Sequence, residues 1–125
     1  MKGIIMMNIL WLSRHVMTDE QLQDLIRIYG EVQVTSYNQS VSSWKDVVTA
    51  GEDCDILAVV LPPAILGDLI NPRNNSKPVI RAVANRVATG NTVVNPASGA
   101  EETEYRFQHV AWEQIKKIEI ITERL

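Results

Sequence analysis

Hydrophobic and polar positions recur along this chain with two different periods, and the switches between them predict an α/β fold. The run Met7–Leu12 is mostly apolar, which is typical of a buried strand. A capping-box pair, Thr18 and Gln21, follows, and leucines and isoleucines then recur at helical spacing up to Gly30. This segment therefore predicts a strand and then a helix of about three turns.

The same order of elements continues through the middle of the chain. Glu31–Tyr37 alternates valines with polar residues, which indicates a strand, and the serines within 40–43 offer caps for a helix that ends near Gly51. The aliphatic run Asp55–Leu61 is typical of a central parallel strand covered on both faces, and Ala64–Ile70 predicts a short helix. Such alternation predicts a parallel sheet with right-handed crossovers.

The last third of the chain loses the helical period. Pro78–Val87 predicts a strand, and Thr89–Glu102 predicts a loop of low order because it is rich in glycine, asparagine and proline. Tyr105–Trp112 and Ile115–Thr122 predict two more strands. We therefore expect one domain over residues 1–125, with a Rossmann-like, mainly parallel sheet flanked by helices and an antiparallel C-terminal strand extension.

Composition narrows the class of protein. A chain of 125 residues with 46% hydrophobic content can bury one core, and its net charge of −3 argues against coating duplex DNA or a membrane surface. The apolar stretch 3–12 is too short to span a bilayer and no cleavage site follows it, so we expect no export signal. The lone Cys54 excludes an internal disulfide, and we expect it to pack in the core of a cytoplasmic protein.

A candidate site follows the first predicted strand, where Ser13, Arg14 and His15 stand in a row. In open α/β sheets, ligands bind outside the carboxyl ends of the strands. A second basic region lies between Leu69 and Ala100, where no acid occurs. Its cations are Arg73, Lys77, Arg81 and Arg86. Such a region suits a small anion, and a solvated loop with stray cations is the alternative.

The segments Ile9–His15 and Met17–Gln21 together resemble the opening of small, stand-alone CRISPR-associated proteins with a Rossmann-like (CARF-like) fold. Those families close with a strand carrying basic residues and an aromatic–x–His–Val strand, here Arg81–Val87 and Phe107–Val110. The resemblance implies that a homodimer of an antiviral defence system binds a cyclic oligoadenylate second messenger and, as in the ring nucleases, cleaves it. The chain departs from the family pattern at Leu61–Ala64, where no glycine-rich phosphate loop occurs.

The resemblance and the local chemistry together give a predicted ligand-binding set. Its members are Ser13, Arg14, Pro62, Arg81, Asn85, Arg86 and His109. Cleavage of an RNA ring needs no metal, because the ribose 2′-hydroxyl attacks the adjacent phosphorus. We expect His15 to act as acid or base, Arg14 to stabilise charge and Ser13 to position the substrate, with no metal and no cofactor.

Plainer interpretations of the same residues stay open. His15 can instead cap the first helix or contact a loop, and His109 and Trp11 can pack within the sheet. The glutamates at 101, 102 and 104 are expected on a solvated loop face.

Two other functions stay open beside the ring nuclease. A non-catalytic sponge of phage or host origin would bind the cyclic nucleotide with the same arginines and histidines but would not cleave it. A ligand-free module that dimerises through its C-terminal strands is the third hypothesis, whereas the lack of a G-x-G-x-x-G disfavours a dinucleotide-dependent oxidoreductase.

Overall fold

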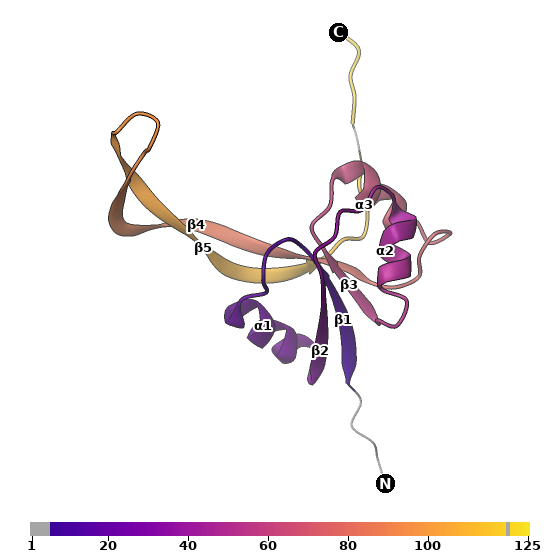
Figure 1. Ribbon diagram of the computed structural model, residues 1–125. Helices are drawn as coiled ribbons and strands as arrows, with labels where there is room; N and C mark the ends of the chain where they lie inside the picture. Colours follow the sequence, from indigo (N-terminus) through magenta and orange to yellow (C-terminus); the bar gives the residue numbers. More distant parts are fainter. Residues whose placement is uncertain (1–5, 120) are drawn as a thin grey trace.

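The computed structural model describes residues 6–119 and 121–125, and within them the chain forms one five-stranded sheet with three helices (Figure 1). The strands are β1 (Met7–Leu12), β2 (Val32–Tyr37), β3 (Ile56–Val59), β4 (Val79–Val94) and β5 (Glu101–Gln114). The helices are α1 (Asp19–Tyr29), α2 (Trp44–Ala50) and α3 (Pro63–Leu69). The sheet order is β2-β1-β3-β4-β5, parallel up to β4 and antiparallel between β4 and β5, which confirms the predicted fold class.

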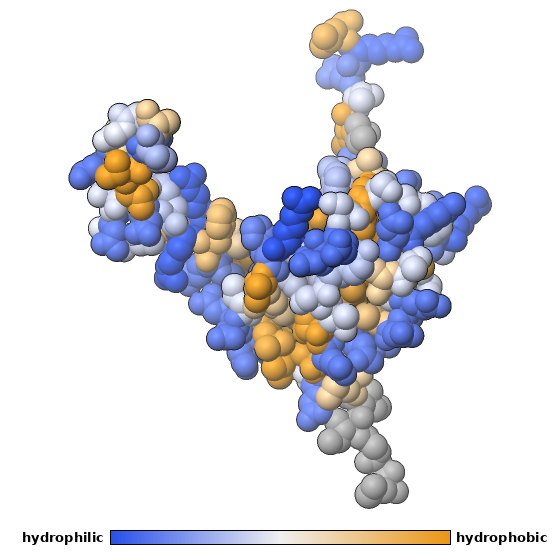
Figure 2. Space-filling view, in the orientation of Figure 1, coloured by the Kyte–Doolittle hydropathy of each residue, from blue (hydrophilic) through white to orange (hydrophobic). Residues whose placement is uncertain are grey.

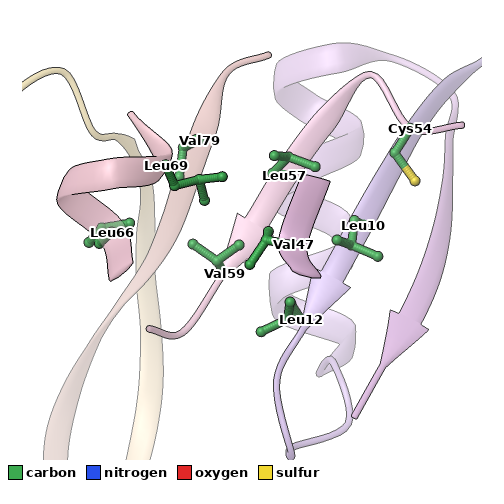
Figure 3. Close-up of a cluster of buried hydrophobic side chains, with 9 residues drawn as sticks. All are labelled: Leu10, Leu12, Val47, Cys54, Leu57, Val59, Leu66, Leu69 and Val79. Atoms are coloured by element: carbon green, nitrogen blue, oxygen red, sulfur yellow. The ribbon is translucent and has the colours of Figure 1, made fainter. Parts of the chain in front are cut away.

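The helices cover both faces of the sheet. Successive residues of a strand point to opposite faces, so β1 supplies side chains to two separate clusters. One cluster packs under α1 and contains Ile9, Trp11, Leu25, Ile56, Ala58 and Ile80. The other packs under α2 and α3 and contains Leu10, Leu12, Val47, Cys54, Leu57, Val59, Leu66, Leu69 and Val79 (Figure 3). The predicted core positions of Trp11 and Cys54 are therefore confirmed.

The first helix begins and ends where its sequence signals predict. Thr18 Oγ1 accepts a hydrogen bond from the Gln21 amide at 3.2 Å, and Gln21 Oε1 accepts one from the Thr18 amide at 2.9 Å. This capping box satisfies two amides that the first turn of a helix leaves unpaired. Gly30 ends the helix at φ +81°, a left-handed conformation that favours glycine.

The predicted loop Thr89–Glu102 is wrong, because most of it is strand. β4 continues to Val94 and β5 begins at Glu101, so the turn is confined to residues 95–100. Gly90, at φ +88°, does not end β4 but lies where the β4–β5 register shifts. A glycine inside a long hairpin marks an irregularity of the ladder as readily as it marks a turn.

The predicted strand Ile115–Thr122 is also wrong over its described residues, which have no regular structure; Ile120 lies outside the described residues. Gln114 pairs with Ile80, and β4 begins at Val79 directly after a proline, so the partner strand has ended. Ile115 donates one further backbone hydrogen bond to Val79, and Ile118 packs against the cluster under α2 and α3.

The β4–β5 hairpin extends away from the body of the molecule (Figure 1). β3 pairs with β4 only at Val79 and Ile80, whereas β4 and β5 pair with each other as far as Val94. We call residues 85–108 the arm. β4 runs in the same direction as β1 and β3 and is much longer, so its outer part extends past their carboxyl ends. The arm therefore leaves the body from the edge of the sheet at which ligands bind in this fold class.

Candidate ligand site at the carboxyl edge of the sheet

The connections that follow two neighbouring strands, β1 and β3, lead to opposite faces of the sheet. The connection after β1 leads to α1 on one face, and the connection after β3 leads to α3 on the other. Such a switch point leaves a crevice at the carboxyl ends of the strands, where sheets of order 2-1-3-4-5 bind their ligands. A pocket of about 320 Å³ lies there. Its lining comes from the loops after β1, β2 and β3, namely residues 12–15, 39–41 and 60–62.

Ser13 fixes the turn that follows β1. Ser13 is buried, with 8% of its surface exposed. Its amide donates to the carbonyl of Tyr37 at 3.2 Å, and its hydroxyl oxygen accepts from the His15 amide at 3.1 Å. Ser13 therefore holds the backbone of the two basic residues that follow it.

Arg14 gives the pocket its positive charge. Its Nη2 donates to Ser40 Oγ at 3.0 Å, which ties the guanidinium to the loop after β2. The residues that line the pocket include no aspartate or glutamate. A guanidinium facing solvent with no acid beside it is suited to a phosphate or carboxylate ligand.

His15 lines the same pocket but its ring is less constrained. Its carbonyl accepts a hydrogen bond from Trp11 Nε1 at 2.8 Å, so its backbone is fixed. In the described part of the chain no hydrogen bond to the exposed imidazole is found. The alternative in which His15 caps the first helix is wrong, because Thr18 does so.

Apolar residues also line the pocket. Val60 follows β3 with 62% of its surface exposed, and Leu61 and Pro62 lie between it and α3. The Pro62 carbonyl accepts the first intrahelical bond, from the Leu66 amide at 3.0 Å. The pocket thus combines cationic and hydroxyl groups with apolar surface.

The structure divides the predicted ligand-binding set in two. Three members line the pocket: Ser13, Arg14 and Pro62. The other four lie along β4 and β5: Arg81, Asn85, Arg86 and His109. None of these four is among the described residues that line the pocket at the ends of β1 and β3.

The residues on the hairpin have partners of their own. Arg81 Nε donates to Glu113 Oε1 at 2.9 Å, and the Arg86 guanidinium lies 3.7 Å from the centre of the Tyr105 ring.

Lys77, in the basic region between Leu69 and Ala100, also has partners within the chain. Its Nζ donates to the carbonyls of Gly51 and Glu52, at 2.6 and 2.8 Å. Lys77 is therefore a structural cation that joins two loops.

His109 packs inside the molecule, as its plainer interpretation held. Its side chain is 6% exposed, and Nε2 lies 2.9 Å from Asp24 Oδ2 on α1. This hydrogen bond, followed by the one from Arg27, lowers the pKa of Asp24 below its ordinary value. Trp112 adds a second link, because its Nε1 donates to the Gln21 carbonyl at 3.0 Å. These contacts fasten α1 to the base of the arm.

His109 and Trp112 face the same helix, which the two-residue period of a strand does not predict. Val83 pairs with Ala111 and Ala84 with His109, so Val110 is an extra residue in β5. This bulge brings the two rings, three positions apart, to 5.8 Å. Strict alternation would place His109 and Trp112 on opposite faces.

No group of three or more metal-ligating side chains is found among the described residues, and none of the described helices is long and apolar enough to cross a membrane. Comparison with protein-family models, with curated proteins and with solved structures gives no match.

Proposed function

We propose that the protein binds a cyclic oligonucleotide second messenger of the cyclic oligoadenylate class in the pocket between β1 and β3. One observation carries this proposal: the switch-point pocket is lined by Arg14 and His15 and by no acid. An oligonucleotide is a polyanion that needs cationic and hydrogen-bonding groups for its phosphates and an apolar surface for its bases.

The pocket supports contact with both parts of a nucleotide. A guanidinium meets a phosphate with two parallel N–H donors, and Arg14 is held in place for this by Ser40. Val60 and Pro62 offer apolar surface to a base in the same pocket. Gln39 and Ser40 add amide and hydroxyl groups for polar recognition.

The size of the pocket favours a homodimer. Small-molecule pockets have volumes of about 300–1,000 Å³, and about 320 Å³ lies at the low end of this range. A ring of several nucleotides exceeds one such pocket, whereas a two-fold dimer presents the pocket twice to a ligand with internal symmetry.

Ring cleavage is a second candidate activity, and it is favoured by the position of His15 beside Arg14. In that reaction a ribose 2′-hydroxyl loses its proton to a base and attacks the adjacent phosphorus, and the leaving 5′-oxygen gains a proton. Arg14 would stabilise the developing negative charge and Ser13 would position the chain. The His15 ring has to be ordered by the ligand before it can act as acid or base. If the ligand does not order it, the protein binds the ring without cleaving it and acts as a sponge.

The test is to incubate the protein, without metal, with a panel of cyclic oligoadenylates and other cyclic nucleotides, and to follow binding by calorimetry and products by chromatography. Arg14→Ala removes a charge-assisted bond worth about 1.5–3 kcal/mol, so affinity should fall about 10- to 150-fold. Linear products would establish a ring nuclease, and a tightly held intact ring would establish a sponge or sensor.

The matched control is Arg73→Ala. Arg73 is exposed and follows α3, on the connection that leads to the amino end of β4. This variant should bind with wild-type affinity. Equal affinities of wild type and Arg14→Ala would exclude the pocket, and no binding of any cyclic nucleotide would favour the ligand-free interaction module.

A further inference from the structure

The arm is a two-stranded ribbon with little support from the rest of the described chain. Beyond the short pairing of β3 with Val79 and Ile80, no described strand pairs with the β3-facing edge of β4, and β5 is the last strand of the sheet. Figure 1 shows the arm leading away from the helices. An isolated two-stranded hairpin is marginally stable in water, and free strand edges are templates for pairing with another chain.

Apolar side chains on the arm face solvent. The large ones are Val93, Val94, Tyr105 and Phe107, with exposures of 45%, 64%, 47% and 78%. Figure 2 shows orange patches on the arm, separated from those on the body by hydrophilic surface. Arg86 pairs with Phe107 across the hairpin and lies over Tyr105, so these three side chains share one face. Clustered exposed apolar side chains of this kind mark an interaction surface.

The charges of the arm are separated along its length. Its two cations, Arg86 and Arg106, occupy the half nearer the body. Its acids lie farther out, toward the turn: Glu101, Glu102 and Glu104. The arm therefore has a basic stem and an acidic tip.

We propose that the arms of two copies of this chain pack antiparallel about a two-fold axis, each acidic tip along the basic stem of the other. A two-fold interface joins identical surfaces, so it requires a surface that complements itself. Antiparallel packing pairs unlike charges at both ends, whereas parallel packing would place like charges together. A partner with a uniform charge would match only half of the arm. The second copy is therefore the occupant that the charge pattern favours.

This dimer goes beyond the proposed ligand and does not depend on it. Arg14 and its pocket lie outside the arm, so a failure of ligand binding leaves the arm interface untouched. Conversely, a protein that binds nucleotide through Arg14 while its arms stay apart would overturn the arm interface alone.

The experiment uses two variants of the full chain that give the arm a single sign of charge. Glu101→Lys with Glu102→Lys leaves four cations and one acid on the arm, because two cations are gained and two of three acids are lost. Arg86→Glu with Arg106→Glu leaves five acids and no cation, because two acids join the three already there. Masses are measured by light scattering after size exclusion at low salt, where surface charge is least screened.

We expect wild type to be a dimer, each variant alone to dissociate at least tenfold more readily, and an equimolar mixture of the two to form a heterodimer. The fourfold variant, which exchanges stem and tip charges, should regain the wild-type mass. Arg73→Glu is the control for a charge change off the arm and should remain a dimer. Circular dichroism of each variant checks that the sheet is intact, since Glu102 also accepts a hydrogen bond from Asn95 Nδ2 at 2.9 Å.

Three results would overturn the proposal. They are a monomeric wild type at all concentrations up to the submillimolar range, a dimer that neither charge variant weakens, and a mixture of the two variants that stays monomeric although wild type dimerises. A monomer whose arm binds nucleic acid would assign its arginines and aromatic rings to that partner instead.

Discussion

Gly51, at the end of α2, packs closely against two leucines of the core. A Cβ atom added there would overlap Leu57 Cδ2 and lie 3.3 Å from Leu10 Cδ2, and both leucines are fully buried. Its φ of −98° is open to any residue, so only the lack of space requires glycine. Gly51→Ala should therefore destabilise the fold by overpacking, by about 1–3 kcal/mol. Urea unfolding followed by tryptophan fluorescence measures this change.

Gly67 is the matched control, because it lies inside α3 with nothing within 4 Å of an added Cβ. Gly67→Ala should raise stability by about 0.5–1 kcal/mol, through reduced freedom of the unfolded chain. If both alanine variants unfold at the same urea concentration, the packing argument for Gly51 is wrong.

Four residues of the pocket could be predicted from their position directly after a predicted strand. Ser13, Arg14, His15 and Pro62 follow predicted strands, and the carboxyl ends of parallel strands meet at one edge of a sheet. The same rule applied after β2 would have added the loop 39–41. The contact between His109 and Asp24 could not be predicted this way, because 85 positions separate them and a bulge decides the direction of the ring.

The interaction between α1 and β5 makes the stability of the fold sensitive to acid. The hydrogen bond from His109, and then that from Arg27, lowers the pKa of Asp24 in the folded state. The unfolded chain therefore binds a proton at Asp24 more readily, and the stabilisation is present above pH ~4 and lost as pH falls through the folded-state pKa. We expect the melting temperature of wild type to fall toward that of Asp24→Asn between pH 5 and about 2.

Thermal unfolding at a series of pH values measures this convergence. Arg27→Gln removes the smaller of the two hydrogen-bond contributions, so it should show the same trend with a smaller difference from wild type. Melting curves of wild type and Asp24→Asn that stay a constant distance apart at every pH would contradict the assignment.

Elements with one strong local signal were predicted, and so was the antiparallel C-terminal extension, whereas the outer part of the β4–β5 hairpin was not. The helix caps, the buried strands and their parallel order follow from hydrophobic period and from capping residues. Residues 89–94 read as a loop because Gly90 and its asparagine neighbour dominate local propensity. The pairing of β4 with β5 overrides that propensity, and such tertiary pairing leaves no local signal.

At the scale of the whole molecule, the body and the arm should differ in how often their hydrogen bonds open. β1 and β3 are buried on both faces, with Leu10 and Leu57 fully enclosed, so their amides should exchange only on global unfolding. In a monomer, arm amides open locally because solvent reaches both faces of the ribbon and few contacts resist fraying.

Hydrogen exchange of the wild-type protein, measured at two protein concentrations, tests the arm interface without any substitution of charged residues. When two arms pack together, amides in 85–94 and 101–108 should gain protection as the protein concentration rises, because dimerisation stabilises the folded arm by mass action. Amides of β1 and β3 serve as the internal reference. The Arg86→Glu, Arg106→Glu variant should show exchange in the arm that does not depend on concentration. If wild-type arm exchange is equally independent of concentration, solvent alone surrounds the arm, and its exposed aromatic rings must serve a different partner.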